Sequence, residues 1–470
     1  MFGLSRTIDR MMWKKMPLIN FFLLIICPLT AVAMVVLVFP EGGKAFLLLT
    51  FLSLLVIFLI RKYSPDRDFL TKVFLLGLYL RISLGILIET LGLLQFFGGD
   101  SIYYDDAGYS ILQYWSQTPG SSGDFSKVEN FINSQSWGIM YLTAFIYFVF
   151  GRSIFIAQSI FCVIGAAVSP MIYFCAKQLY DNKRVARTSA LFIACFPTFI
   201  VWSSLILKDG PILFLIVLAI SMVMVLQKRF SFPAIICLIL SLSAIFCLRF
   251  YIFYVVVASV LLGLIIGTNF TFNSLVKRVI AVTILGLGLI YFGVSERAVT
   301  NFEKFADIEN LQAVRQDTSR KFNSGFGQDF DVTSVEGAIS ALPVGLVYLL
   351  FAPFPWEVNN FRQLITLPEV LVWWCLMPLL IKGIWFTLKT RLRKSIPILV
   401  FALMLTVSYA LLQSNVGTAY RHRTQIQVFL FMFIAVGWTL MQEKREIRFV
   451  WRLNRYRRFF NKPPIRIKEN

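Results

Sequence analysis

Histidine is almost missing from this 470-residue chain, and charged residues are scarce. His422 is the sole histidine, and 15% of the residues are Asp, Glu, Lys or Arg. A metal site built from several imidazoles is therefore excluded. A soluble chain carries about a quarter charged residues, so water is not the main solvent of this protein.

The chain also lacks a cysteine framework, an internal repeat and a low-complexity linker. The seven cysteines have neither the spacing of a zinc site nor the pattern typical of a secreted disulfide scaffold. Most of them, such as Cys162 and Cys175, fall inside apolar runs, where they act as small packing residues. One membrane domain is predicted to account for most of the chain.

Long apolar runs are what the sequence does contain, since 58% of its residues are hydrophobic. Runs of about 17 residues or more are long enough to cross a hydrocarbon core roughly 30 Å thick. They predict an all-α polytopic integral membrane protein with about twelve transmembrane helices. The predicted spans are 17–39, 45–60, 70–95, 154–176, 188–206, 210–226, 232–249, 251–268, 277–294, 370–388, 396–413 and 424–441.

The distribution of lysine and arginine predicts that both chain ends lie in the cytoplasm. The net charge is +20, but the basic residues occupy short segments between apolar runs, where they hold loops inside. Attraction to anionic lipid explains them, and no nucleic-acid partner is predicted. The inner basic residues are Arg61, Lys62, Arg67, Lys72, Lys177, Lys183, Arg184, Arg187, Lys228, Arg229, Lys277, Arg278, Lys389, Arg391, Arg393 and Lys394.

Two apolar segments are too short to cross the membrane, and the N-terminus allows two interpretations. Segments 137–150 and 339–352 are predicted to be juxtamembrane or re-entrant helices at the outer face. The N-terminus resembles a signal peptide, but its apolar run continues past Ala33, which favours a retained first helix. We divide the chain into an N-terminal helix pair (1–68), a membrane core (69–441) and a basic cytoplasmic tail (442–470).

Carboxylates gather in the predicted outer loop 98–135. Asp105 and Asp106 are adjacent, and Asp100 lies shortly before them. Neighbouring carboxylates repel each other, which raises the pKa of one of them and suits it to act as a general base. Their oxygens also suit a divalent cation. The alternative is a solvated acidic loop.

A second group of polar residues falls at other outer turns. Lys208 and Asp209 form either an interfacial ion pair or, through Asp209, a second acidic site in the same cavity. Arg249 lies at the end of a predicted span, and Tyr420, Arg421 and Arg423 precede the last one. Arginine has no topological use outside, and its planar fork suits phosphate. The predicted phosphate-binding residues are Arg421, Arg423, Arg249, Tyr420 and Lys208. A metal ion, if one is used, is predicted at Asp105 and Asp209; no other cofactor is indicated.

Two further charges, Arg81 and Glu89, lie inside a predicted span. Ionisable groups within the membrane are functional candidates. The two residues are about 12 Å apart along a helix, so direct pairing is not expected. For Arg81 the alternative is contact with a polar group of another helix.

Carboxylates beside arginines at a membrane surface suit chemistry on a lipid-linked phosphate. Four short elements then resemble the GT-C superfamily of membrane glycosyltransferases, including its protein mannosyltransferase and aminoarabinose transferase branches. The resemblance covers roughly residues 70–441. Its elements are Asp105-Asp106-Ala107-Gly108-Tyr109; Phe150-Gly151-Arg152-Ser153; Pro197, Ser203, Ser204 and Asp209; and Tyr420-Arg421-His422-Arg423.

The resemblance implies inverting transfer of a sugar from a polyprenyl-phosphate donor to a sugar, glycolipid or protein acceptor at the extracytoplasmic face. It implies that an Asp of the first outer loop is the base and that a bacterial cytoplasmic membrane is the location. The family's Asp-Glu is Asp-Asp here, so Asp105, Asp106 and Asp100 all remain candidates. The alternatives are a polysaccharide polymerase using lipid-pyrophosphate units, with 295–338 as its large outer loop, and a lipid or polysaccharide flippase. A flippase is disfavoured because no paired halves are visible.

Overall fold

The fold comes from a computed structural model, and it confirms an all-α integral membrane protein. The structure describes residues 17–116, 137–267, 272–294 and 332–459, and isolated residues between these ranges. Within this part, seven helices are long and apolar enough to cross a membrane. The number of spans and their orientation stay predictions.

Helices make up most of the described part of the chain. In chain order they are α2 (Pro17–Leu37), α3 (Glu41–Tyr63), α4 (Arg67–Thr90), α5 (Leu94–Ser116), α7 (Trp137–Phe150), α8 (Ile154–Tyr180), α9 (Lys183–Cys195), α10 (Pro197–Val201), α11 (Asp209–Lys228), α12 (Phe232–Leu248), α13 (Phe250–Ile266), α14 (Phe272–Tyr291), α17 (Val335–Phe351), the 3-10 turn η1 (Pro355–Glu357), α18 (Phe361–Leu412) and α19 (Val416–Phe459).

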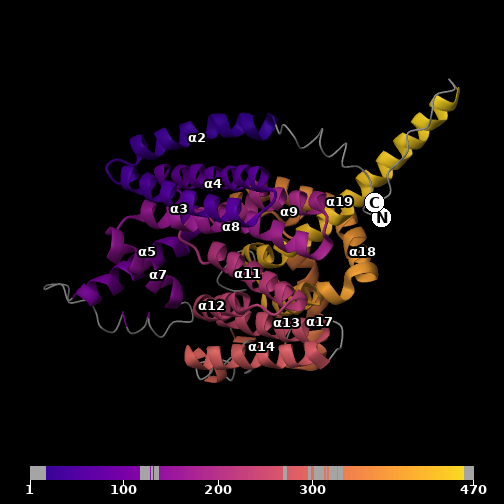
Figure 1. Cartoon of the computed structure of the whole chain (residues 1–470). Coiled ribbons are helices and arrows are strands. Elements are labelled where there is room, and N and C mark those ends of the chain that lie inside the picture. The colour runs from indigo at the N-terminus through magenta and orange to yellow at the C-terminus, as the bar shows by residue number, and fades with distance from the viewer. Residues whose placement is uncertain are drawn as a thin grey trace.

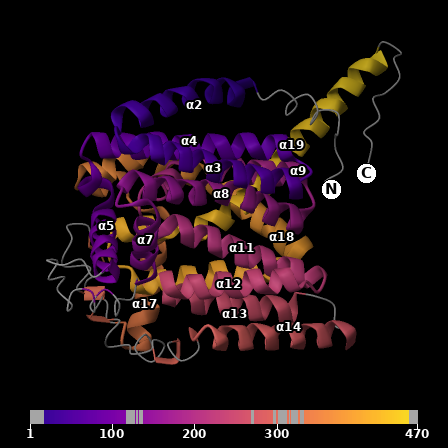
Figure 2. The same cartoon turned by 60° about the vertical axis from the view of Figure 1, so that its left-hand side comes forward.

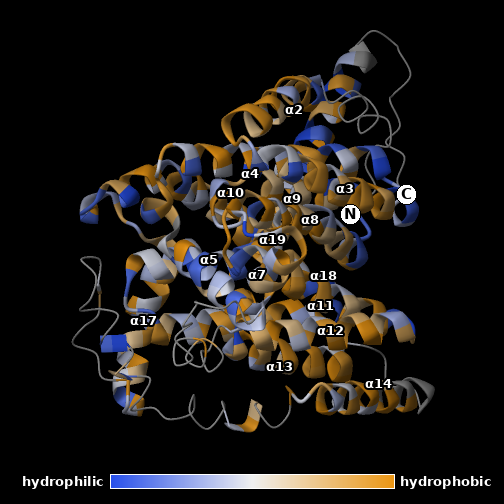
Figure 3. Ribbon diagram, turned by 90° about the vertical axis from the view of Figure 1, so that its left-hand side faces the viewer, coloured by the Kyte–Doolittle hydropathy of each residue, from blue (hydrophilic) through white to orange (hydrophobic). Residues whose placement is uncertain are grey.

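Most of the long helices run side by side (Figure 1). In Figure 2, α5, α7 and α17 lie across one end of this bundle. Figure 2 shows α5 and α7 roughly perpendicular to α4, α8 and α11. In Figures 2 and 3, α17 also stands across the bundle. These placements agree with surface-lying helices at 137–150 and 339–352. We call this end, which carries Asp100, Asp105 and Asp106, the acidic end.

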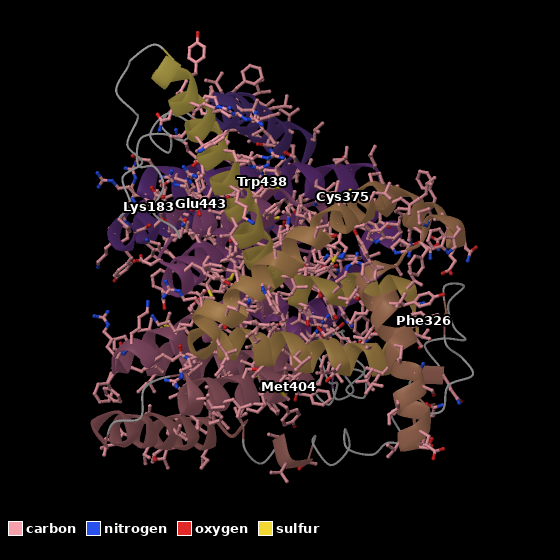
Figure 4. The ribbon with its side chains drawn as sticks, turned by 90° about the vertical axis from the view of Figure 1, so that its right-hand side faces the viewer. Lys183, Phe326, Cys375, Met404, Trp438 and Glu443 are labelled. Atoms are coloured by element: carbon pink, nitrogen blue, oxygen red, sulfur yellow. The ribbon has the colours of Figure 1, made fainter. Side chains whose placement is uncertain are left out.

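The opposite end carries lysine and arginine, and we call it the basic end. Asp66, in the α3–α4 turn, accepts two hydrogen bonds from Arg187 at 2.7 and 2.6 Å. Arg184 pairs with Glu446 of α19 at 3.0 Å. Figure 4 shows Lys183 and Glu443 towards one end of the bundle and Phe326 towards the other.

The predicted third span and outer loop are wrong in their bounds. Helix α4 ends at Thr90, and Gly92 adopts a φ of +66°, a conformation open to glycine. The chain then starts α5 at Leu94, so the acidic motif lies on a helix and not in a loop.

The predicted span 188–206 is also wrong, because α9 stops at Cys195. Pro197 lacks a backbone N–H donor and pushes Phe196 into an extended conformation, with φ −73° and ψ 126°. The five-residue α10 follows, and residues 202–208 are irregular. The sequence thus places a non-helical segment at the acidic end.

The last two helices are longer than predicted. Helix α18 covers the predicted span 370–388 and, up to Leu412, the predicted span 396–413, with non-helical backbone at Arg391 between them. Helix α19 starts at Val416, so Arg421 and Arg423 lie in its first turns and not before it. The predicted basic tail, which begins at residue 442, continues α19 as a helix as far as Phe459.

Close packing against α8 holds the irregular segment in place. A Cβ on Gly165 of α8 would lie 2.4 Å from Cβ of Ser203, so only glycine allows this approach. The long helices are largely hydrophobic along their ribbons (Figure 3). Exposed apolar side chains on α2 and α3 are typical of a lipid-facing surface.

Candidate functional site

Helix α5 carries two groups of polar residues that meet different parts of the acidic end. Asp100 and Tyr104 are four residues apart, and so are Asp105 and Tyr109, which gives two neighbouring stripes on one helix. Asp100 and Asp105 are about 7.5 Å apart along the helix axis. The two groups are therefore neighbours.

The first group is the acidic pair, Asp105 and Asp106, held by α7 and by the connection between α7 and α8. Tyr147 donates a hydrogen bond to Oδ1 of Asp105 at 2.5 Å. The guanidinium of Arg152 bonds to Oδ2 of Asp105 at 2.6 Å and to Oδ1 of Asp106 at 2.9 Å. The Asp105 side chain is 7% exposed, whereas that of Asp106 is 66% exposed.

Arg152 is fixed by more than its two carboxylates. Its guanidinium lies 4.2 Å from the ring centroid of Tyr109, within cation–π distance. The hydrogen bond to Asp105 raises the pKa of Arg152 further. A permanent positive charge therefore bridges the acidic pair.

The second group is the Asp209 cluster: Asp209, Arg249, Arg421 and Asp100. Asp209 is fully buried at the start of α11 and bonds to Arg249 at 3.0 Å and to Arg421 at 2.9 and 2.6 Å. Arg421 also donates a hydrogen bond to Oδ2 of Asp100 at 2.6 Å, and the Asp100 side chain is 53% exposed. The structure therefore brings together four residues singled out in the sequence.

Several buried donors around Asp209 lack an acceptor within the described part of the chain. They include Nε and Nη1 of Arg249 and the indole Nε1 of Trp202. Arg421 lies 5.0 Å from the Trp202 ring centroid. Buried polar groups are normally hydrogen-bonded, so these donors indicate room for an acceptor-rich ligand or for water.

Lys208 lies beside the Asp209 cluster and outside the membrane-spanning helices. Burial and the nearby Arg249 charge lower the pKa of Lys208 to about 7, although Asp209 acts in the opposite sense. Lys208 therefore loses its proton more readily than an ordinary lysine. A bound anion would favour the charged form.

Arg423 and Tyr420, predicted to bind donor phosphate, face elsewhere. Arg423 is fully buried and donates to the carbonyl oxygens of Leu350 and Ala352 at 2.9 and 3.0 Å. The Tyr420 hydroxyl lies 2.7 Å from Oγ1 of Thr198. The structure joins these two residues to the end of α17 and to α10, not to Asp209.

Arg81 and Glu89, the two charged residues predicted inside a span, differ in their hydrogen bonding. Arg81 is buried and bonds to Ser203 Oγ at 2.7 Å and to the Gly77 carbonyl at 2.8 Å. It thereby ties α4 to the irregular segment 202–208, which is the structural alternative considered for it. Glu89 lies near Asp105, and its Oε2 is buried without a hydrogen-bond partner among the described residues.

The carboxylates do not fit a divalent metal as they stand. Both oxygens of Asp105 accept bonds from Tyr147 and Arg152, and both oxygens of Asp209 accept bonds from arginine. Within the described residues, no three His, Cys, Asp or Glu side chains lie close enough together to hold a metal. The neighbouring guanidinium groups of Arg152, Arg249 and Arg421 also disfavour binding of a cation.

Comparisons with known proteins give only distant structural matches. No protein-family model matches the chain, and no curated protein matches it. One similar structure is the oligosaccharyltransferase AglB of Archaeoglobus fulgidus with an inhibitory peptide and a dolichol-phosphate, at 14% identity and TM-score 0.41 over 71% of this chain and 44% of that one. Another is an apo oligosaccharyltransferase of the same organism, at 13% identity and TM-score 0.40 over 70% and 44%.

The chain thus spans less than half the length of these two proteins. By name they transfer oligosaccharides, and the sequence motifs here also resemble membrane glycosyltransferases. TM-scores this low nevertheless give no support to a particular function, so function is considered from the residues of this chain alone.

Arg152 and Tyr147 are the contacts that sequence reasoning missed. Arg152 is an arginine at the predicted outer face, the same signal that singled out Arg249. Tyr147 is one of 17 tyrosines and lies in a uniformly apolar helix. No sequence signal marks it.

Proposed function

We propose that this protein is a membrane glycosyltransferase that takes a sugar from a polyprenyl-phosphate donor at the acidic end. The observation that carries the proposal is the Asp209 cluster, with two arginines and unsatisfied guanidinium donors on Arg249. The acidic pair, one short helical step away, supplies carboxylates for proton transfer. We place the acidic end at the extracytoplasmic face, as the charge distribution predicts.

Arg249 and Arg421 are suited to the donor phosphate. Guanidinium groups bind phosphate through parallel hydrogen bonds. Two arginines against buried Asp209 leave one positive charge, which Asp100 balances from the exposed rim. A donor phosphate would replace the Asp100 carboxylate on Arg421 and satisfy the unpaired donors of Arg249.

Asp105 is suited to the role of base. Tyr147 holds its Oδ1, while among the described residues its Oδ2 is held by Arg152, which also contacts Asp106. Arg152 can therefore release Oδ2 to an acceptor hydroxyl and keep its ion pair with Asp106. Hydrogen bonds at catalytic groups often rearrange in this way when substrate binds.

The reaction is then a direct displacement. Oδ2 of Asp105 takes the proton of the acceptor hydroxyl, whose oxygen forms the new bond to the anomeric carbon. The bond between that carbon and the phosphate oxygen breaks, and its electron pair stays on the lipid phosphate. Arg249 and Arg421 stabilise this departing charge, and a single displacement inverts the anomeric centre.

Purified full-length protein can be tested with a panel of polyprenyl-phosphate sugars and with sugar, glycolipid and peptide acceptors. The expected result is formation of a glycosylated acceptor and free polyprenyl phosphate. Arg249→Gln should lose donor binding, whereas Tyr348→Phe, which removes a hydroxyl that bonds to Glu357 and not to the Asp209 cluster, should not.

Other outcomes would point to the other functions considered. Turnover only with lipid-pyrophosphate oligosaccharides, lost in Arg421→Gln but kept without the acidic pair, would identify a polymerase. Movement of the intact lipid across the bilayer without a covalent product would identify a flippase. Either result contradicts the proposal.

A further inference from the structure

A small basic pocket lies at the basic end, away from the site described above. It has a volume of about 220 Å³ and lies where α8, α11, α13 and α18 meet. Helix α11 begins at Asp209 and ends at Lys228, so its 20 residues separate this pocket from the Asp209 cluster by about 30 Å. The pocket is lined by Gln178, Met224, Gln227, Lys228, Gly267, Arg393 and Lys394.

Positive charge surrounds the opening of this pocket. Lys228, Arg393 and Lys394 are exposed, and no carboxylate is among the described lining residues. Asp181, an acidic residue close enough to Lys228 to interact with its charge, pairs with Lys177 at 2.6 Å. Non-helical backbone at Arg391 interrupts α18 just before Arg393 and Lys394, and both residues line the pocket together with Lys228 of α11.

The interior of the pocket offers hydrogen-bonding groups that are not in use. Both Oε1 and Nε2 of Gln178 are buried and have no hydrogen-bond partner among the described residues. Gln227, in contrast, donates to the Gly263 carbonyl at 2.9 Å, and Lys228 donates to the Gln178 carbonyl at 3.0 Å. An orphaned buried amide is costly without a ligand or water, and this one can both donate and accept.

We propose that this pocket binds the phosphate group of an anionic lipid headgroup in the leaflet at the basic end. The three cations match the phosphate, and the Gln178 amide matches a headgroup hydroxyl, as in a glycerol headgroup. The volume is below the roughly 300–1,000 Å³ of pockets for drug-sized molecules, so it suits a headgroup and not a whole lipid. This binding is independent of the glycosyltransferase proposal.

Native mass spectrometry of the full-length chain in detergent tests the proposal with phosphatidylglycerol and phosphatidylcholine. The pocket variant is Lys228→Gln with Arg393→Gln and Lys394→Gln. Its control, Arg61→Gln with Lys444→Gln and Arg445→Gln, removes equal charge from exposed residues elsewhere. The pocket variant should bind phosphatidylglycerol about tenfold more weakly or worse, while the control stays within about twofold of wild type.

A single change inside the pocket separates a built site from general attraction. Gln178→Leu keeps the charge and replaces an unsatisfied amide with an apolar side chain of similar size, which is close to neutral for folding. It should weaken phosphatidylglycerol binding severalfold. Equal losses in the two triple variants, or unchanged binding in Gln178→Leu, would overturn the proposal.

Inorganic phosphate distinguishes the two sources of the same chemistry. If millimolar phosphate displaces the lipid, the phosphate group alone is the ligand and a free anion can fill the pocket. If the lipid is retained, the headgroup and its acyl chains contribute as well. Both results require that the pocket variant loses binding while the control does not.

Discussion

Asp209→Asn should destabilise the protein far more than Asp100→Asn, although each change removes one carboxylate from Arg421. Asp209 is fully buried between Arg249 and Arg421, whereas the Asp100 side chain is 53% exposed. Removing one partner of a buried ion pair costs about 3–5 kcal/mol, because the remaining charge stays buried. Removing a partner from an exposed pair costs roughly 0.2–1 kcal/mol.

The expected difference between the two variants is therefore roughly 2–5 kcal/mol in the free energy of unfolding. Unfolding by SDS titration in mixed micelles, followed by circular dichroism, measures it for wild type and both variants. Adding Arg421→Gln to Asp209→Asn leaves fewer buried unpaired charges, so the combined cost should fall below the sum by about 0.5–3 kcal/mol. Equal stability of Asp209→Asn and Asp100→Asn would refute a buried charge cluster held by Asp209.

Three further predictions concern single residues at the acidic end. Binding of a polyprenyl-phosphate sugar should weaken as pH rises above about 7, because the bound phosphate keeps Lys208 protonated whereas Lys208 of the unliganded protein loses its proton. Isothermal titration calorimetry should show an affinity that does not change with pH in Lys208→Gln. Tyr147→Phe should lower kcat by about tenfold or more with little change in KM, since it frees the acidic pair to move; steady-state kinetics that match wild type would contradict this role. Gly165→Ala should lower the free energy of unfolding by about 1–3 kcal/mol through overcrowding, whereas Gly43→Ala, with open space around it, should not; equal unfolding midpoints would show that the close approach is unimportant.

The helical membrane fold could be predicted because long apolar runs and inner basic residues are strong signals. The helix boundaries at the acidic end were harder to predict from the sequence. The sequence 98–116 is rich in polar residues and reads as a loop, yet it forms α5 because its buried face packs on α7. Conversely, the apolar run 188–206 reads as one helix, but Pro197 breaks it.

The candidate site was partly predictable. Arginines out of place by the positive-inside rule singled out Arg249 and Arg421, which meet at Asp209. The same rule selected Arg423, whose partners are backbone carbonyl oxygens that no sequence pattern reveals. Which arginine faces the Asp209 carboxylate depends on the rotation of α19, and the sequence at the start of that helix does not encode this rotation.

The rate of polyprenyl phosphate release by wild type, Asp105→Asn and Asp106→Asn tests the glycosyltransferase proposal most directly. With the accepted donor and acceptor, Asp105→Asn should lower the rate by about 10²–10⁴-fold, the contribution of a general base. Asp106→Asn should lower it by less than about tenfold, since Asp106 only shares Arg152. Turnover at the wild-type rate in both variants would contradict the role of the acidic pair as the base in sugar transfer.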